Sequence, residues 1–187
     1  IDELLEHRVF LETRNAGRVQ FAHDVLRELV VEDLTANRAR VLHRRVAELL
    51  ERRRELKPDA VSVAALAEHY RAANDEQKAF GYYLEAARTA LDAYAFSDAL
   101  RQLSAAQEIL PDEAEARARY TLYEMLGVAN ACQLRFDESN AAYKLALEHA
   151  PDAICRSKVY LGIAKNMQDE NKKEAAIAAY DAALETL

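Results

Sequence analysis

The sequence has no tryptophan and is poor in glycine, proline and cysteine. Its 187 residues include four Gly, three Pro and two Cys. All-β proteins and proteins that alternate strands with helices use more Gly and Pro residues, because those residues form their turns. The composition therefore favours an all-α fold.

The four glycines, Gly17, Gly81, Gly127 and Gly162, are far apart in the sequence. A loop that cradles phosphate needs several glycines within a few residues, so no nucleotide-binding loop can be written here. The His-Glu-x-x-His and Cys-x-x-Cys patterns of common zinc sites are also missing. We therefore expect no catalytic residue, no cofactor and no metal site, and we predict that the protein is not an enzyme.

The cysteines and histidines are predicted to have structural roles. If Cys132 ends one helix and Cys155 starts the next parallel one, they lie about 20 Å apart, too far for a disulfide. We therefore expect reduced, half-buried thiols. For His23 and His43 we expect packing or helix capping, because a lone His seldom acts without an orienting partner.

The sequence has no apolar run of transmembrane length and no signal peptide. Together with reduced cysteines, this predicts a cytoplasmic protein without a membrane partner. The net charge of −7 combines +1 over residues 1–57 with −8 over residues 58–187, so nucleic acid is not expected as a partner of the second region. The first residue, Ile1, falls within an amphipathic pattern, which suggests a piece of a longer protein.

A short signature recurs along the chain: a small residue, an aromatic residue or Leu four positions later, and Ala three positions after that. These spacings place the three residues on one face of a helix. Such a repeat predicts stacked helical hairpins, with the tyrosines in the core between them. The four copies are Ala79-Tyr83-Ala86, Ala99-Leu103-Ala106, Ser139-Tyr143-Ala146 and Ala176-Tyr180-Ala183.

The first third of the chain has a different pattern. Two β-prone runs, 9–13 and 18–21, flank Asn15-Ala16-Gly17 and predict a hairpin, which is followed by a helical pattern over 23–34. A long helix is predicted from Thr35 to about residue 56. Its predicted packing seam consists of Ala39, Leu42, Val46, Leu49 and Leu50.

Beyond Pro58 the apolar periodicity predicts seven helices joined by turns of two to four residues. Turns this short make successive helices antiparallel. Each hairpin then exposes an apolar stripe that its neighbour must cover, so we expect the helices to form a stack. The predicted spans are 60–73, 76–94, 97–110, 113–133, 136–150, 154–169 and 172–187.

The repeats resemble the tetratricopeptide repeat (TPR), a helix–turn–helix unit of about 34 residues. The clearest unit has Tyr123, Leu126 and Gly127 in its first helix and Tyr143 and Ala146 in its second. The resemblance covers three repeats, or four if the helix at 76–94 is counted as the second helix of an earlier unit. It implies a right-handed superhelix of antiparallel hairpins.

The N-terminal third carries a second resemblance, in the runs 19–28, 42–50 and 65–70. These runs resemble the region that follows the ATPase core in signal-transduction ATPases with numerous domains, a group that includes LuxR-type large ATP-binding regulators and ATPase-linked cyclases and kinases. The resemblance implies three parts: the end of a winged helix over 1–34, a basic connecting helix over 35–57, and the repeats over 58–187.

Two groups of residues are candidates for binding. By the register of the family, six residues face the concave side of the superhelix: Arg88, Glu124, Val128, Lys158, Leu161 and Lys165. They lack the Lys/Asn pattern by which some repeats of this family hold a peptide carboxylate. The second group, Arg38, Arg45 and Arg52, recurs every seven residues along one flank of the long helix, so we expect an interdomain contact or a solvated face rather than DNA binding.

The sequence thus predicts a non-catalytic binding domain of a multidomain bacterial signalling or transcription regulator. A protein, a peptide or a small effector would occupy the repeats, and the helices at 23–56 would transmit that occupancy to a neighbouring ATPase domain. Two alternatives remain open. The repeats are a passive scaffold for a partner protein, or the N-terminal third contacts DNA.

Overall fold

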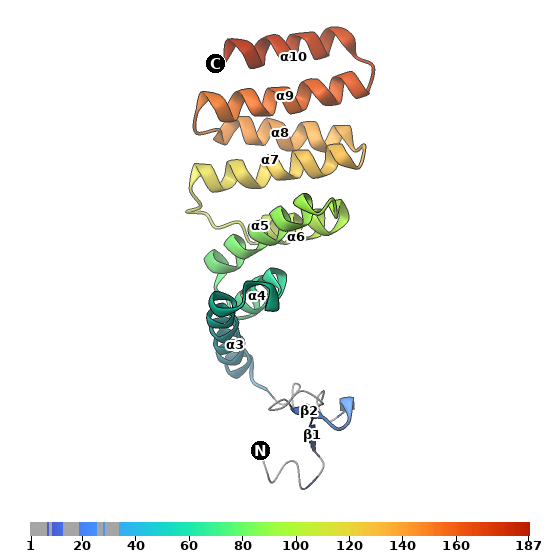
Figure 1. The fold of residues 1–187 in the computed structure, drawn as a ribbon. Coiled ribbons are helices and arrows are strands. Elements are labelled where there is room, and N and C mark those ends of the chain that lie inside the picture. The colour runs from blue at the N-terminus through green and yellow to red at the C-terminus, as the bar shows by residue number, and fades with distance from the viewer. Residues whose placement is uncertain (1–6, 8, 13–18, 26–27, 29–33) are drawn as a thin grey trace.

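The computed structural model describes residues 7, 9–12, 19–25, 28 and 34–187. Its helices lie on one another in a single elongated stack, with a two-stranded hairpin beyond α3 at one end and α10 at the other (Figure 1). The predicted all-α fold is confirmed at this level. The helices are α3 (Ala36–Leu56), α4 (Val63–Ala72), α5 (Glu76–Asp92), α6 (Phe96–Glu108), α7 (Ala116–Cys132), α8 (Phe136–His149), α9 (Ala153–Asp169) and α10 (Lys173–Glu185).

The hairpin consists of β1 (Phe10–Glu12) and β2 (Val19–Phe21), which pair antiparallel with Phe10 opposite Phe21. The two phenylalanine rings meet edge to face with their centroids 4.7 Å apart. The predicted hairpin is therefore present. Its turn, and most of the helix predicted over 23–34, lie outside the described residues.

Two helices begin later than the periodicity indicated. Pro58–Ala60 form a separate 3₁₀ turn, η1, so α4 starts at Val63 with Ser62 as its N-cap. Similarly, α7 starts at Ala116. Apolar spacing marks the face of a helix, but the local turn chemistry determines where the helix starts. In the described part of the chain, no helix has the length and apolar character that crossing a membrane would require.

The same left-handed turn ends four of the helices. Asn74, Tyr94, Leu134 and Asn171 have φ angles of 60°, 58°, 59° and 61° after α4, α5, α7 and α9. In each turn the next N–H donates to a carbonyl five residues earlier, as from Ala95 to Ala90 at 2.8 Å. This is the Schellman pattern, which closes a helix and reverses the chain. Because α5 has this turn on both sides, it forms a hairpin with α4 and also with α6.

Most of the recurring signature lies in the core. Its small residues are buried in all four copies, and Tyr83 and Tyr143 are buried as well. Tyr180 is the exception, because 37% of its surface is exposed. The prediction that it packs between helices is wrong to that extent, since no further helix of the described chain covers α10 on its outer side.

The predicted seam of α3 is also wrong in part. Leu42, Val46 and Leu49 are exposed, and Ala47 is fully buried instead. The face that packs onto α4 and α5 consists of Ala47 and residues at helical spacing from it: His43, Leu50, Glu51 and Arg54. Apolar residues are present on both sides of α3, and polar contacts on the inner side determine which side faces the stack.

Candidate functional site

The six predicted binding residues lie on three helices that neighbour one another. Arg88 is on α5, Glu124 and Val128 are on α7, and α9 carries Lys158, Leu161 and Lys165. The helix α7 contacts both α5 and α9. The six predicted residues therefore lie on three helices in contact through α7, and we call this set of residues the α5–α7–α9 face.

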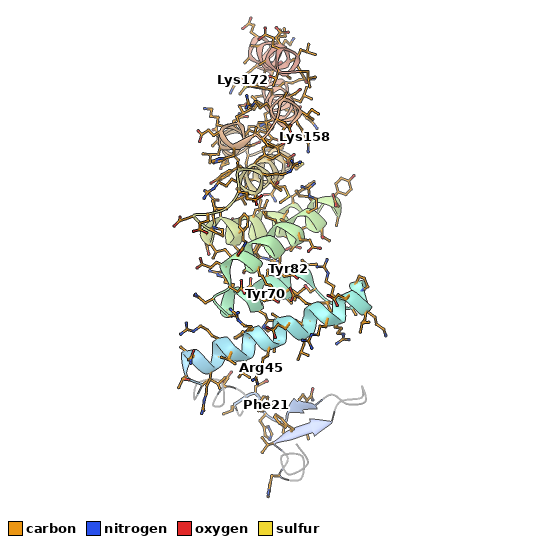
Figure 2. The ribbon with its side chains drawn as sticks, turned by 90° about the vertical axis from the view of Figure 1, so that its left-hand side faces the viewer. Phe21, Arg45, Tyr70, Tyr82, Lys158 and Lys172 are labelled. Carbon is orange, nitrogen blue, oxygen red and sulfur yellow. The ribbon has the colours of Figure 1, made fainter. Side chains whose placement is uncertain are left out.

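Two of these residues form an ion pair. Nζ of Lys158, which is labelled in Figure 2, lies 2.9 Å from Oε1 of Glu124. The side chain of Glu124 is 9% exposed and that of Lys158 is 62% exposed. Packing of α7 against its neighbours buries the carboxylate, and a buried carboxylate needs a partner. The lysine head remains open to solvent, which leaves a cation at the surface of this pair.

The other four candidates are not brought into contact with one another by hydrogen bonds or ion pairs in the described part of the chain. Leu161 and Lys165 are exposed on α9, Arg88 is exposed on α5, and Val128 is half-buried. The α5–α7–α9 face thus presents cations and one exposed leucine around a single buried carboxylate. This combination can accept a segment with both acidic and apolar groups.

Aromatic side chains pack between the helices next to the α5–α7–α9 face. Burial raises the pKa of Tyr120 and of Tyr143 well above the usual tyrosine range, and the negative charge of Glu124 adds to both shifts. Both hydroxyls are therefore protonated at neutral pH. Tyr123 stacks on His149 with the ring centroids 5.9 Å apart. These rings join α7 to α8 and belong to the packing rather than to the surface.

The arginines of α3 lie on its outer side. Arg38, Arg45 and Arg52 are all exposed. The ion pairs found among the described residues do not include their guanidinium groups. Leu42 and Leu49 are also exposed, and helical spacing places them beside the arginines and opposite Ala47. Arg45 lies on the side of α3 that faces the hairpin (Figure 2). The outer side of α3 therefore combines a basic stripe with an apolar one.

A cavity of about 520 Å³, which no sequence pattern predicted, lies where α3, α4, α5 and α6 meet. Its walls are largely aliphatic and contain no aromatic ring. The first residues of α4 form part of its wall. Its lining residues are Arg54, Pro58, Val61, Ser62, Val63, Ala64, Glu85, Ala86, Thr89, Ala90, Ala93, Ala95, Asp98, Arg101 and Gln102.

The four charged groups of this cavity form two ion pairs. Arg54 of α3 makes a two-point ion pair with Glu85 of α5, and this contact raises the pKa of the guanidinium further. Arg101 pairs with Asp98 one turn away on α6, at 2.9 Å. Both side chains of the second pair are largely exposed, so this pair is weak and can exchange partners.

Gln102 is the polar residue of the cavity that has no partner. It is 8% exposed, and its Oε1 atom is buried without a hydrogen bond in the described structure. Leaving such an atom unpaired costs about 1–3 kcal/mol of stability. No sequence signal marked Gln102, because a glutamine on a helix is ordinarily a surface residue.

A second polar cluster joins α3, α4 and α5. Glu51 accepts hydrogen bonds from Tyr82 at 2.5 Å and from Lys78, and Lys78 also donates to the hydroxyl of Tyr70 at 2.9 Å. The Tyr70 and Tyr82 rings stack with centroids 5.6 Å apart (Figure 2). Hydrogen bonds from the two tyrosines and from Lys78 lower the pKa of Glu51 despite its burial. The cluster fixes the angle between α3 and its neighbours.

His43 forms a pair that the sequence did not predict. Its Nδ1 lies 2.9 Å from Nδ1 of His69 on α4, with the rings tilted toward each other. One ring must donate and the other accept, so at least one of the two is neutral. Burial, followed by the charge of His43, lowers the pKa of His69. The predicted packing role of His43 is consistent with this contact.

Both cysteines are free thiols. Cys155 is half-buried as expected, but Cys132 is exposed because it occupies the last turn of α7. Within the residues that the structure describes, no group of three or more His, Cys, Asp or Glu side chains is arranged to hold a metal ion.

These features define an all-helical stack with two candidate binding regions, the α5–α7–α9 face and the cavity at Gln102. No known family model matches the chain, and no curated protein matches it either. Among solved structures, the chain is similar to that of BtubC (BKLC) from P. vanneervenii, with a TM-score of 0.50 and 20% sequence identity. The match covers 87% of this chain and 77% of that one. At this level of identity the similarity concerns the fold alone.

Proposed function

We propose that the chain is a non-catalytic binding domain of the TPR type, in which the α5–α7–α9 face receives a partner. The observation that carries the proposal is the exposed set of Lys158, Leu161 and Lys165 on α9, next to the Glu124–Lys158 pair. The Lys158 head remains 62% exposed although it pairs with Glu124, and Lys165 and Leu161 beside it are exposed as well, so this part of α9 is open to a partner.

The partner that fits this face is a protein segment with acidic and apolar residues. Lys158 and Lys165 are seven residues apart and Leu161 lies between them, so all three project from one side of α9. An acidic residue of the partner can pair with each lysine, and an apolar residue can cover Leu161. A small effector acting at the repeats remains the alternative occupant.

The repeat arrangement supports assignment to the TPR type. Tyr143 of α8 fills the space between Gly127 of α7 and Gly162 of α9, and the same turn closes α5, α7 and α9. Successive hairpins that repeat one packing arrangement form a superhelix with an extended binding surface.

The outer side of α3 supports a contact with a neighbouring domain, which we propose to be the ATPase core of a signalling regulator. Exposed Leu42 and Leu49 beside Arg45 and Arg52 suit a surface that is covered by protein, because an apolar stripe is unfavourable in water. We also propose that the hairpin is the wing of a winged helix. The protein would then work in the cytoplasm, where such regulators act.

The binding test uses peptides selected from a random displayed library on the immobilised chain. Their affinity is then measured for the variant Lys158→Glu/Lys165→Glu. The control, Lys144→Glu/Lys173→Glu, changes the same charge on α8 and α10. We expect at least tenfold weaker binding for the first variant and no change for the control. Equal losses in both would show that the peptides respond to net charge and not to this face.

The coupling test measures nucleotide exchange by the complete regulator with and without a bound peptide. A switch requires that the peptide binds one arrangement of the stack better than the other. A changed exchange rate is the expected result. Unchanged exchange with a peptide of proven affinity would instead establish a passive scaffold.

DNA contact through α3 is the second candidate function, because Arg38, Arg45 and Arg52 are free of ion pairs in the described chain. Three phosphate contacts would give salt-sensitive binding of duplex DNA. Filter binding of duplex DNA is measured for the wild type and for the variant Arg38→Ala/Arg45→Ala/Arg52→Ala. Micromolar binding that disappears in the variant would favour DNA over an interdomain contact.

A further inference from the structure

The cavity between α3, α4, α5 and α6 combines features that point to a ligand of its own. It is separate from the α5–α7–α9 face, and it goes beyond the function proposed above. At about 520 Å³ it lies within the size range of sites for small molecules. One polar side chain in its wall, Gln102, has a buried oxygen without a partner.

The first polar feature is the start of α4. The first two N–H groups of this helix, from Val63 and Ala64, have no acceptor within the helix, and both residues line the cavity. Ser62 caps the following N–H, from Ala65, and the first turn contains no acidic side chain. The positive end of the helix is therefore available to a carboxylate.

The second polar feature lies on α6. Asp98 and Gln102 are four residues apart and so project from the same side of that helix. Both line the cavity. Asp98 supplies a negative charge, and the Gln102 carbonyl needs a hydrogen-bond donor. An ammonium group satisfies both requirements at once.

The charges of the walls select between ligand classes. A simple anion would approach Glu85 and Asp98, and a simple cation would approach Arg54 and Arg101. A zwitterion avoids both conflicts, because each of its two charges has an opposite charge in the wall to pair with. Apart from Ser62, Thr89 and Gln102, the remaining wall residues are apolar, among them Val61, Val63 and Ala90, and they suit a short apolar side chain.

We propose that this cavity binds a free α-amino acid with an aliphatic side chain. The carboxylate lies at the N–H groups of Val63 and Ala64. The ammonium group donates to Oε1 of Gln102 and faces Asp98. The side chain packs against the aliphatic wall. The bound ligand bridges α4 and α6 and so stabilises one arrangement of this end of the stack.

The test follows backbone and side-chain amide signals by NMR during titration with L-leucine. Saturable shifts are expected for the amides of Val63 and Ala64 and for the side-chain amide of Gln102. N-acetyl-L-leucine has lost the ammonium group and L-leucinamide has lost the carboxylate. Each should bind at least tenfold more weakly than L-leucine.

Two substitutions with one control locate the site. Gln102→Leu removes the acceptor and should weaken L-leucine binding at least tenfold. Asp98→Asn changes an exposed charge without disturbing the core and should weaken it severalfold. The control Gln107→Leu makes the same change at an exposed position of α6 and should leave binding unchanged.

Several results would overturn the proposal. These are no saturable shift at millimolar L-leucine, equal binding of either half-analogue, or equal effects of Gln102→Leu and Gln107→Leu. The dipeptide Leu-Leu tests whether the cavity binds a free amino acid or a peptide, since tighter binding of the dipeptide would assign the cavity to a peptide. Peptide binding at the α5–α7–α9 face should be unaffected by Gln102→Leu, so the two proposals fail independently.

Discussion

A Cβ atom added to Gly127 would lie 2.3 Å from Cε1 of Tyr143, closer than nonbonded carbon atoms approach one another in folded proteins. The same ring blocks Gly162, where an added Cβ would lie 2.6 Å from Cζ. One tyrosine of α8 therefore fills the space that glycines on α7 and α9 leave open. This contact holds together the two helices that carry most of the proposed binding face.

Gly127→Ala should lower the free energy of unfolding by about 1–3 kcal/mol, because the ring must move out of a close-packed site. Urea denaturation at neutral pH measures the change. The loss should shrink in a Tyr143→Leu background, since the clash is with the ring itself.

Gly81 provides the matched control. It also lies inside a helix, but an added Cβ would meet nothing within 4 Å. Gly81→Ala should raise the free energy of unfolding by about 0.5–1 kcal/mol, because alanine loses less backbone freedom on folding. If Gly127→Ala were as benign as Gly81→Ala, the packing role of Tyr143 would be wrong.

A second prediction concerns the buried polar contacts of Ser139. Its hydroxyl donates to the Gly127 carbonyl at 2.7 Å and accepts from the Asn166 amide at 2.8 Å. Ser139→Ala should cost about 1–3 kcal/mol, since it leaves the buried groups of α7 and α9 with fewer partners. Thermal unfolding of the wild type and of Ser139→Ala measures this loss of stability. A neutral result would mean that water or Asn140, which also accepts from Asn166, replaces the serine.

A third prediction is a dependence of stability on pH. The pKa of His69 in the folded protein is lowered below its ordinary value, chiefly by burial and then by the charge of His43. Stability from neutral His69 is therefore present above about pH 6.5 and is lost as the pH falls below that value. The loss should be on the order of 0.5 kcal/mol, because both rings are partly exposed and solvent screens their repulsion.

Denaturation at pH 7 and pH 5 measures this effect. His69→Gln should reduce the difference between the two pH values, whereas substitution of His149, which stacks on Tyr123, should leave it intact. An undiminished difference in His69→Gln would show that other groups account for the acid sensitivity.

The unpaired oxygen of Gln102 leads to a fourth prediction. Gln102→Leu should raise the free energy of unfolding by about 1 kcal/mol, because it removes a buried acceptor without a partner and adds apolar contact. A residue that reduces stability and is nevertheless present is expected at a binding site. Destabilisation by Gln102→Leu would indicate that the amide is satisfied by bound water.

The sequence predicted the stack well, because apolar spacing of three and four residues is repeated over the whole C-terminal part. It also placed the six residues of the α5–α7–α9 face on neighbouring helices. The side of α3 that packs could not be read in the same way. Leu42 and Leu49 look like core residues, yet Ala47 is buried, because Glu51 and Arg54 form polar contacts with α5 on that side.

The cavity at Gln102 was beyond sequence reasoning for a different reason. It depends on where η1 ends and α4 begins, and on two left-handed turns on either side of α5. These turns are formed by Asn74 and Tyr94 and not by glycine, the residue that usually marks them. The His43–His69 pair was missed likewise, since the packing side of α3 was predicted incorrectly in part.

Hydrogen exchange of the chain with a selected peptide bound shows where the peptide lies. We expect slower exchange in α7 and α9 around Glu124, Lys158 and Lys165, and no comparable change in α8 or α10. This pattern should be absent with the Lys158→Glu/Lys165→Glu variant at the same peptide concentration. Protection confined to α3, or spread evenly over the stack, would contradict the assignment of the α5–α7–α9 face as the binding surface.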